Sequence, residues 1–530
     1  SLTDTRNQRG TTRIFTYVES GGRGNGGNIA INGESLFVSK KARIAASTNG
    51  NGNAGNIFIN VDGPIELLEG DILSDSERQA NGDGGNITIK TGSLLLNGEP
   101  GNVARVRTNV ERQGNAGKIL VQANDSVTLV NGGTITSNIE NNAIGNSGGI
   151  VIEARALSMN NGGRVQALTR GTGKAGNIQV NAKNSVVISG NSDYTTSSGL
   201  YTSTELGAGA QAGNINVKTG ELRISGNAVL NARSRSNYRG GNITLEVDTL
   251  SLTGGGQLLT TAFGSGDAGD ITINATEGVT ISGSDPSYFT RQVKLANQGR
   301  NSDDLVANDT PASGLLARTL GAGNGGNLKI TTGELIVKDG AIITSQSTGQ
   351  GNAGKISIGT NSLEVTGGGQ ILTTTTSSGS AGETVVNAKD TITVSGSDLS
   401  YRSRLAEANQ LVQQGIFPTI DRIITNVGSN SGLLGQTQGS GSAGNLTLQA
   451  GRLTIADNAK LSASTSQTST GIGGTIRLNV GQLNLRNGAE VTVSNEGIGN
   501  AGNLEISARS IKLDNQATIT AKTRSGNGGN

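Results

Sequence analysis

The sequence predicts an all-β fold: a parallel β-helix, or β-solenoid, in which about 15 coils of the chain stack on one another. Three observations predict it: a recurring glycine–asparagine phrase, a spacing of 28 residues between its occurrences, and apolar residues that alternate with period two inside each interval. Such alternation indicates strands with one buried face. The glycine and asparagine clusters between strands indicate turns, because both residues tolerate positive φ.

The phrase is Gly-Asn-(Ala/Gly)-Gly-Asn-Ile, and its last polar position recurs sixteen times, with seven of the fifteen intervals equal to 28. This regularity excludes a disordered glycine-rich polymer. Charged replacements at this position, such as Lys118 and Asp270, place it at a solvent-facing corner. Stacked asparagines would form an amide ladder there. The ladder asparagines are Asn28, Asn56, Asn86, Asn177, Asn214, Asn242, Asn327, Asn445 and Asn503.

Each interval contains three bursts of alternating apolar residues, and in the first interval these begin at Ile29, Leu36 and Ile44. Three short strands and three turns in about 28 residues make one coil with a roughly triangular section, and we expect a right-handed coil. Successive coils would lie about 4.8 Å apart.

We expect residues 1–530 to be a single continuous solenoid segment of a longer chain. Residues 11–27 already read as the end of an earlier coil, and neither end of the sequence supplies a cap. Three insertions, at about 191–211, 284–313 and 397–432, interrupt the coil between its second and third strands. They recur every three coils and should project from one edge.

The two longer insertions have helical patterns. Asp285 followed by Pro286 is typical of an N-cap with proline at the first helical position, and Asp398 begins a similar run. The insertions also gather aromatic residues, which makes them candidate contact loops; the alternative is that each helix covers an apolar patch on the flank of the solenoid. The candidate contact residues are Tyr194, Tyr201, Tyr288, Phe289, Tyr401 and Phe417.

The composition excludes several chemistries. The chain has no histidine and no cysteine, which excludes Ser–His–Asp and Cys–His catalysis, ordinary zinc sites and disulfides. Forty-two basic and forty acidic residues are too balanced for an electrostatic nucleic-acid binder, and no apolar stretch is long enough for membrane insertion. Basic residues of the first part, such as Arg105 and Arg107, are dispersed among acidic ones and are expected on a solvated face.

We expect no cofactor and no enzymatic activity. The segments around Asp83 and around Asp267 and Asp270 resemble calcium-binding nonapeptides, but the period of 28 does not fit an array of them, so only incidental calcium binding is left open. Glycan-cleaving β-helices use paired carboxylates, and Asp303–Asp304 is the pair that an enzymatic alternative, acting on a polysaccharide, would use.

The repeat GNxGNI-x-I … L-x-L-x-x-G-x-x-I-x-T … GNAGNI, seen from about residue 11 to 530, resembles the β-helical stalks of filamentous haemagglutinin-like exoproteins, especially cyanobacterial members. The resemblance implies two-partner export through an outer-membrane pore, a location outside the bacterial cell or on its surface, and no catalytic residues in the stalk.

The expected function is therefore that of a non-enzymatic, secreted or cell-surface adhesin stalk that presents loops for attachment to surface or matrix glycans or proteins. The alternative is a structural subunit of an extracellular filament, sheath or matrix, built by self-association of the rods.

Overall fold

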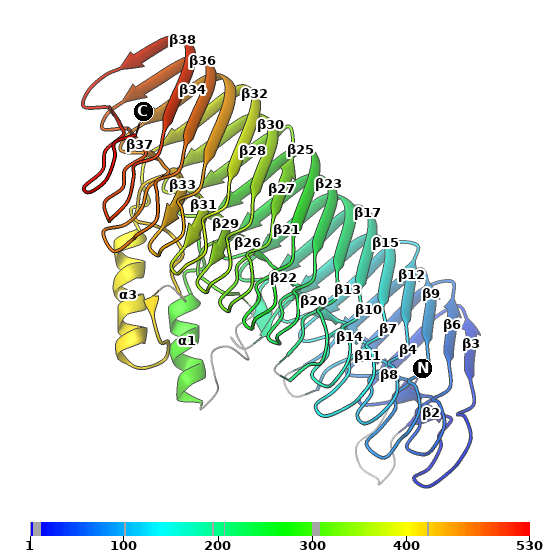
Figure 1. The fold of residues 1–530 in the computed structure, drawn as a ribbon. Coiled ribbons are helices and arrows are strands. Elements are labelled where there is room, and N and C mark those ends of the chain that lie inside the picture. Colours follow the sequence, from blue (N-terminus) through cyan, green and yellow to red (C-terminus); the bar gives the residue numbers. More distant parts are fainter. Residues whose placement is uncertain are drawn as a thin grey trace. The chain divides into compact units, whose positions relative to one another are not determined.

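The computed structural model describes residues 12–99, 102–192, 196–205, 207–298, 308–420 and 423–529, together with the backbone of residues 2–3. The chain is a nearly all-β solenoid of about 17 turns with roughly 29 residues per turn, which confirms the predicted fold class. Figure 1 shows the parallel strands of successive coils lying side by side. The chain divides into two compact units: Ser1–Arg223 with Ala228–Thr244, and Ile224–Asn227 with Leu245–Asn530.

The first unit contains two parallel sheets and one small antiparallel pair. First and second strands of its coils are β3 (Ile29–Gly33), β4 (Leu36–Ser39), β6 (Ile57–Val61), β7 (Pro64–Leu68), β9 (Ile87–Thr91), β10 (Ser93–Asn97), β12 (Ile119–Ala123), β13 (Ser126–Val130), β15 (Ile150–Asn160), β17 (Ile178–Ser189) and β21 (Ile215–Ser225), and the short β1 (Leu2–Thr3) pairs with β4. Third strands are β2 (Arg13–Phe15), β5 (Arg43–Ala45), β8 (Asp71–Leu73), β11 (Arg105–Arg107), β14 (Thr134–Thr136), β16 (Arg164–Gln166), β20 (Gly199–Tyr201) and β22 (Val229–Asn231). The antiparallel pair is β18 (Asn191–Ser192) with β19 (Thr196–Ser197).

The second unit repeats this plan and adds two helices. Its first and second strands are β23 (Ile243–Thr253), β25 (Ile271–Ser282), β27 (Leu328–Thr331), β28 (Glu334–Lys338), β30 (Ile356–Thr366), β32 (Thr384–Ser395), β34 (Leu446–Ala456), β36 (Ile476–Arg486) and β38 (Leu504–Leu513). Its third strands are β24 (Gln257–Leu259), β26 (Gly314–Leu316), β29 (Ile342–Ser347), β31 (Gln370–Thr375), β33 (Gly432–Thr437), β35 (Lys460–Ser462), β37 (Glu490–Thr492) and β39 (Thr518–Thr520). The helices are α1 (Tyr288–Asn297) and α3 (Tyr401–Gln413).

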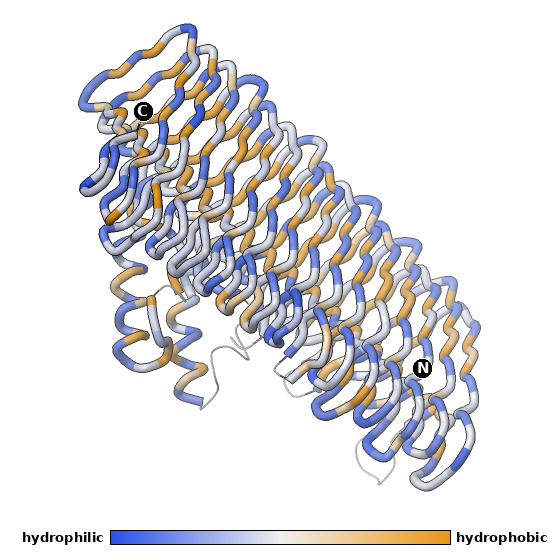
Figure 2. Tube along the Cα trace, viewed as in Figure 1, coloured by the Kyte–Doolittle hydropathy of each residue, from blue (hydrophilic) through white to orange (hydrophobic). Residues whose placement is uncertain are grey.

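Strands form because apolar side chains alternate, and each packs over the equivalent side chain of the next coil. In β6 the buried and exposed positions alternate strictly, and the pairing of β6 with β9 sets Ile57 beside Ile87 and Ile59 beside Ile89. All four are 0–1% exposed. Figure 2 shows the same alternation of hydrophobic and hydrophilic residues along the strands. The core of each unit is thus a set of aliphatic columns, each one residue position wide.

The first two strands of a coil differ from the prediction in one respect. They are separate in the early coils, but in β15 and most later coils they run together as one strand of ten to twelve residues. The coils that carry the three insertions have the longest of these strands, β17, β25 and β32, with twelve residues each. Pairing of β17 with β15 and of β32 with β30 shifts register at the bend, so the extra residue forms a β-bulge there.

After the third strand the chain makes a closed loop that returns to the glycine–asparagine corner. In one early coil the amide of Gly55 donates to the carbonyl of Ala46 at 2.8 Å. A Cβ at Gly55 would lie 1.9 Å from the carbonyl oxygen of Gly27 in the preceding coil, so only glycine allows the coils to approach this closely.

The predicted corner asparagines stack, but a backbone N–H of one coil donates to the side-chain oxygen of the coil before it, in place of a bond between two side-chain amides. The Oδ1 atom of Asn28 accepts the backbone N–H of Asn56 at 2.8 Å, and Asn56 in turn accepts from Asn86. The same bond links Asn177, Asn214 and Asn242, and it joins Asp270 to Asn327, Asn327 to Lys355 and Asn445 to Thr475. Asn503 lies in the same column, where its carbonyl accepts the amide of Ile476.

A second ladder lies three residues earlier, at the first asparagine of the phrase. Asn25 accepts from Asn53, Asn53 from Asp83, and Asp83 from Asn115, at 2.7–2.9 Å. The column continues through Asn146 to Lys174, and Asp267, Asn324 and Asn352 form it in the second unit. The sequence signal was present, since both asparagines of the phrase recur with the same period.

None of the helices in the described ranges combines the length and the apolar character that crossing a membrane requires.

The ladder makes a prediction about local stability. Asn86→Ala removes the acceptor of the Lys118 amide, which lies 2.8 Å away, and should cost about 1 kcal/mol. Hydrogen exchange of the Lys118 amide should therefore become roughly fivefold faster. Asn86→Asp keeps an acceptor, as Asp83 does naturally, and should change the exchange rate less.

Asn60→Ala is the matched control, because Asn60 is exposed on β6 and its side chain makes no hydrogen bond with a described residue. Equal acceleration of the Lys118 amide in both alanine variants would show that the ladder bond contributes nothing.

Candidate functional site

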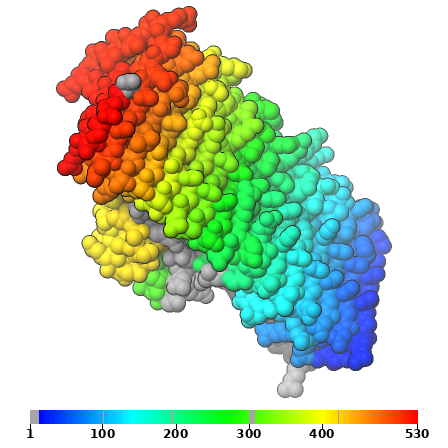
Figure 3. Space-filling model, in the orientation of Figure 1, coloured from blue at the N-terminus to red at the C-terminus, as the bar shows by residue number. Residues whose placement is uncertain are grey.

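The two long insertions of the second unit form one lobe. Helices α1 and α3 pack against each other and lie beside one another next to the coil turns (Figure 1). In the space-filling view the residues of α3, in yellow, stand out from the coils (Figure 3). The lobe has a hydrophobic core of its own, composed of Tyr288, Phe289, Leu295, Ala408, Leu411, Phe417, Ile423 and Ile424.

The aromatic side chains predicted as contacts lie in this core instead. Tyr288, Phe289 and Phe417 are 1%, 6% and 8% exposed, and Tyr401 is partly buried against the same cluster. The rings of Tyr288 and Phe289 pack edge to face with centroids 5.5 Å apart. Rings of this size stabilise a small core by burial, so they hold the lobe together and are not available to a partner. Each helix packs against the helix of the other insertion.

The first insertion, in the other unit, is shorter than expected, because residues 199–201 already form the third strand β20. Tyr201 is 7% exposed, its hydroxyl donates to the carbonyl of Ser197 at 2.6 Å, and burial raises the pKa of the phenol. It is a structural residue rather than a contact residue. Tyr194 lies outside the described residues.

The helices begin two residues later than predicted. Ser287, not Asp285, occupies the N-cap position of α1. Asp285 instead uses Oδ1 to accept the backbone N–H and the hydroxyl of Ser287, at 2.9 and 2.8 Å, and forms an ion pair with Arg291. Asp398, Ser400 and Arg404 repeat this arrangement before α3. The carboxylate therefore orders the entry to each helix from outside it.

A glutamine of the preceding coil holds the end of each long insertion. The Nε2 atom of Gln257 donates to the carbonyls of Thr310 and Ala312, both at 2.7 Å, and its Oε1 accepts the amide of Asp309. Gln370 makes the equivalent contacts with Val427 and Asn430. Both glutamines follow three glycines, in Gly254–Gln257 and Gly367–Gln370. The contacts that hold an insertion on the preceding coil, called its seat below, are thus repeated together with the insertion.

Glycine and serine complete the seat in all three insertions. A glycine amide of the preceding coil donates to a serine hydroxyl at 2.9–3.0 Å, and the pairs are Gly162 with Ser198, Gly255 with Ser313, and Gly368 with Ser431. Gly368 has φ +81°, and a Cβ there would lie 2.3 Å from the Cβ of Asp398. The glycine is required both by its conformation and by the space it leaves.

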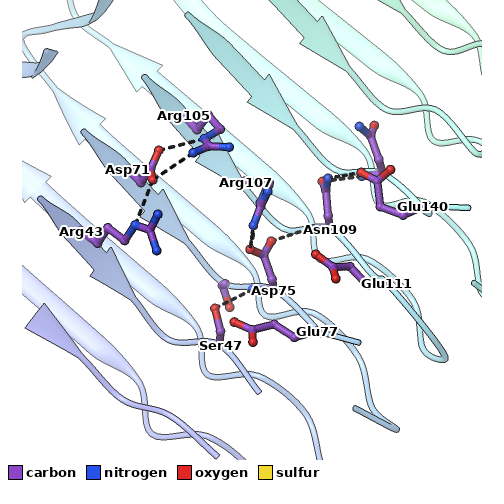
Figure 4. A network of polar contacts seen from close by, with 12 residues as sticks. Arg43, Ser47, Asp71, Asp75, Glu77, Arg105, Arg107, Asn109, Glu111 and Glu140 are labelled. Atoms are coloured by element: carbon purple, nitrogen blue, oxygen red, sulfur yellow. Dashed lines mark hydrogen bonds and ion pairs between the residues drawn. The ribbon is translucent and has the colours of Figure 1, made fainter. Parts of the chain in front are cut away.

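A second polar feature, in the first unit, is a network of ion pairs along the third strands (Figure 4). Asp71 pairs with Arg43 from the coil before and with Arg105 from the coil after, at 3.2 and 3.0 Å. The next buried acid, Asp75, accepts two hydrogen bonds from Arg107, at 2.6 and 2.9 Å. Asp71 and Asp75 are buried, so these arginines are not simply solvated, as had been expected for Arg105 and Arg107.

Electrostatics in this network favour structure over acid–base chemistry. Burial raises the pKa of the Asp75 carboxyl, and the Arg107 guanidinium acts against that rise. Burial also raises the pKa of Glu77, which accepts a 2.7 Å hydrogen bond from the Tyr17 hydroxyl. The two aspartates are held by arginines, and such charge-assisted pairs stabilise the stacked coils.

The other sequence candidates lie either in the corner ladders or outside the described residues. Asp83, Asp267 and Asp270, the alternatives for incidental calcium, accept backbone amides as members of the corner ladders. Within the described ranges no three acidic side chains gather as a metal ion would need. Asp303 and Asp304, the pair of the enzymatic alternative, lie outside the described residues.

The seat of the third insertion can be tested with Gly368→Ala. The new methyl group meets Asp398 and forces a residue other than glycine to adopt positive φ, which should destabilise the seat by about 1–3 kcal/mol. Limited proteolysis within 397–432 should become faster, while the coils stay resistant. Gly359→Ala is the control, because a Cβ there meets nothing within 4 Å; unchanged cleavage of the Gly368→Ala lobe would contradict the proposed seat.

The pKa of Glu77 makes a prediction about pH. Because the folded pKa is raised, the folded chain binds this proton more tightly than the unfolded chain, whose Glu pKa is about 4.3. This group therefore lowers stability as pH rises from that value through the folded pKa. Glu77→Gln should remove this contribution, so that the variant gains stability relative to the parent chain between about pH 4 and about pH 7.

Denaturant unfolding of both proteins at the two pH values measures the effect. Glu34→Gln, at an exposed carboxylate, should show no such gain, and a gain that is the same for both variants would refute the role of burial.

Comparisons with known proteins identified no similar protein. No protein-family model, no curated protein and no solved structure matches this chain. The β-solenoid is therefore established by its own strand pairing, and the likeness to filamentous haemagglutinin-like stalks rests on the repeat phrase alone.

Proposed function

We propose that this chain is a non-enzymatic stalk of a secreted or cell-surface bacterial adhesin of the filamentous haemagglutinin-like type. The observation that carries the proposal is the lobe: two insertions in coils three turns apart share one hydrophobic core and are fastened to the coils by duplicated contacts. A lobe built in this way stays at a fixed position on the stalk, as a displayed attachment site must.

The coils suit the supporting role. Each is joined to its neighbours by backbone pairing and by side-chain ladders, so each coil needs only the preceding one as a template. Such a chain can fold coil by coil as it emerges from an export pore. The absence of cysteine makes this folding independent of the redox state outside the cell. Export through an outer-membrane partner and a location at the cell surface are part of the proposal.

The contact surface is the exposed side of the lobe, since its aromatic rings are buried. Leu399, two residues before α3, is 95% exposed. Arg402 and Glu407 are exposed on the helix itself. A large exposed apolar residue beside exposed charges is a common arrangement in protein interaction sites. Surface or matrix proteins and glycans are the partner classes that such a surface suits.

The adhesin proposal predicts that changing this surface abolishes attachment. Leu399→Ser with Arg402→Glu should reduce attachment of producing cells at least tenfold, because both positions lie at the centre of the proposed contact. Ile498→Ser with Arg486→Glu alters another exposed apolar residue and another exposed arginine elsewhere in the same unit, and should leave attachment intact.

Immuno-electron microscopy with an antibody against the α3 segment checks location and assembly in the same cells. Attachment lost only with the lobe variant supports the adhesin. Attachment that persists in both variants, with label along fibres, would favour the structural filament instead. Label seen only after permeabilisation would refute a surface role.

A further inference from the structure

A polar groove runs across four coils of the second unit, along the bend between first and second strands. It has a volume of about 590 Å³ and is lined by residues of β32, β34, β36 and β38. Asn387, Gln449, Asn479 and Ser507 occupy one position in successive coils and form a row of amide and hydroxyl groups. Gly451 and Gly481 form the floor at the bend, because they carry no side chain.

A cationic side chain lies in the first and in the last of the four coils that line this groove. Lys389 belongs to the bulge of the twelve-residue strand β32, and Arg509 occupies the position of the two glycines in the last of the four coils. The guanidinium of Arg509 leans over the floor, since a Cβ on Gly481 would lie 3.0 Å from its Nη2. Neither cation makes a hydrogen bond or an ion pair with any other described residue, and no acidic residue lines the groove.

The groove excludes two classes of ligand. An extended peptide cannot add to the sheet here, because the backbones of β34 and β36 already pair with the coils on both sides. Single-stranded nucleic acid binds by stacking on aromatic rings, and none lines the groove. What the groove offers is a row of hydrogen-bonding groups repeated once per coil, about 4.8 Å apart, between two unpaired positive charges.

We infer that this groove binds a linear anionic polysaccharide lying along the coil axis. Its hydroxyl groups would meet the row that begins at Asn387, and its carboxylate or sulfate groups would pair with Lys389 and Arg509. The two cations are three coil steps apart, about 14 Å, so a chain of several sugar rings is needed to contact both. The site is separate from the lobe and does not depend on its proposed role.

The test measures binding by the purified chain with isothermal titration calorimetry. Polygalacturonate carries carboxylates, dextran sulfate carries sulfates, dextran is neutral, and polyglutamate is a polyanion without sugar. We expect binding of polygalacturonate or dextran sulfate, whichever anionic group the groove prefers, and at least tenfold weaker binding of dextran and polyglutamate. Lys389→Ser with Arg509→Ser should weaken polysaccharide binding about tenfold or more, since two charge-assisted contacts are lost.

The control is Lys329→Ser with Arg486→Ser, which removes the same charge from exposed strand positions outside the groove. Binding lost only in the groove variant, with hydrogen exchange of β34 and β36 unchanged, supports the site. Equal losses in both variants would mean diffuse charge attraction and overturn it, as would equal binding of dextran or polyglutamate, or no binding of any polysaccharide. Lobe variants should bind normally, so failure here and failure of the adhesin proposal remain distinguishable.

Discussion

The solenoid depends on backbone hydrogen bonds that join the strands of each coil, in register, to the strands of the neighbouring coils. Parallel pairing in register places the residues at the same position of successive coils one coil spacing apart. Each position must therefore hold a residue that can pack against the equivalent residues of the neighbouring coils. Isoleucine columns such as Ile57 with Ile87 satisfy this inside. At the corners, the oxygen of Asn56 satisfies it by accepting the next backbone amide. In one column of charges the signs alternate over three coils, from Arg43 through Asp71 to Arg105.

The same constraint determines where the chain can vary. A residue added within a strand would shift every side chain to the opposite face, so length changes are confined to the bends. The long insertions leave the coil between second and third strands, beside glycines such as Gly255 and Gly368 that adopt positive φ. In two of these coils the other bend contains a bulge, in β17 and in β32.

Much of the fold could be predicted because it follows from periodic patterns along the sequence. A period of 28 and a period of two suffice for coils, strands and corner columns. The sequence also contained the second ladder and the Arg43–Asp71–Arg105 column, which appear once the coils are aligned position by position. The lobe could not be foreseen in the same way. Tyr288 and Phe417 are far apart in sequence, and no repeat indicates that the two insertions pack together rather than project separately. Aromatic residues in an insertion therefore suggested contact when their role was core.

Function in such a molecule has to arise where the repetition is interrupted. A perfectly repeated face offers a ligand the same weak contact at every coil, so the ligand has no unique binding site there. The lobe interrupts the repeat by adding a compact core to the flank of the coils. The groove at Gly451 and Gly481 interrupts the repeat by a smaller change. Two glycines, which have no side chains, lie between the bulge at Lys389 and the side chain of Arg509. Both interruptions keep the coil spacing, so any ligand that itself repeats along its length meets matching groups at successive coils. The regular coil spacing thus sets the distance between successive binding groups, and the residues that interrupt the repeat determine which ligand can bind.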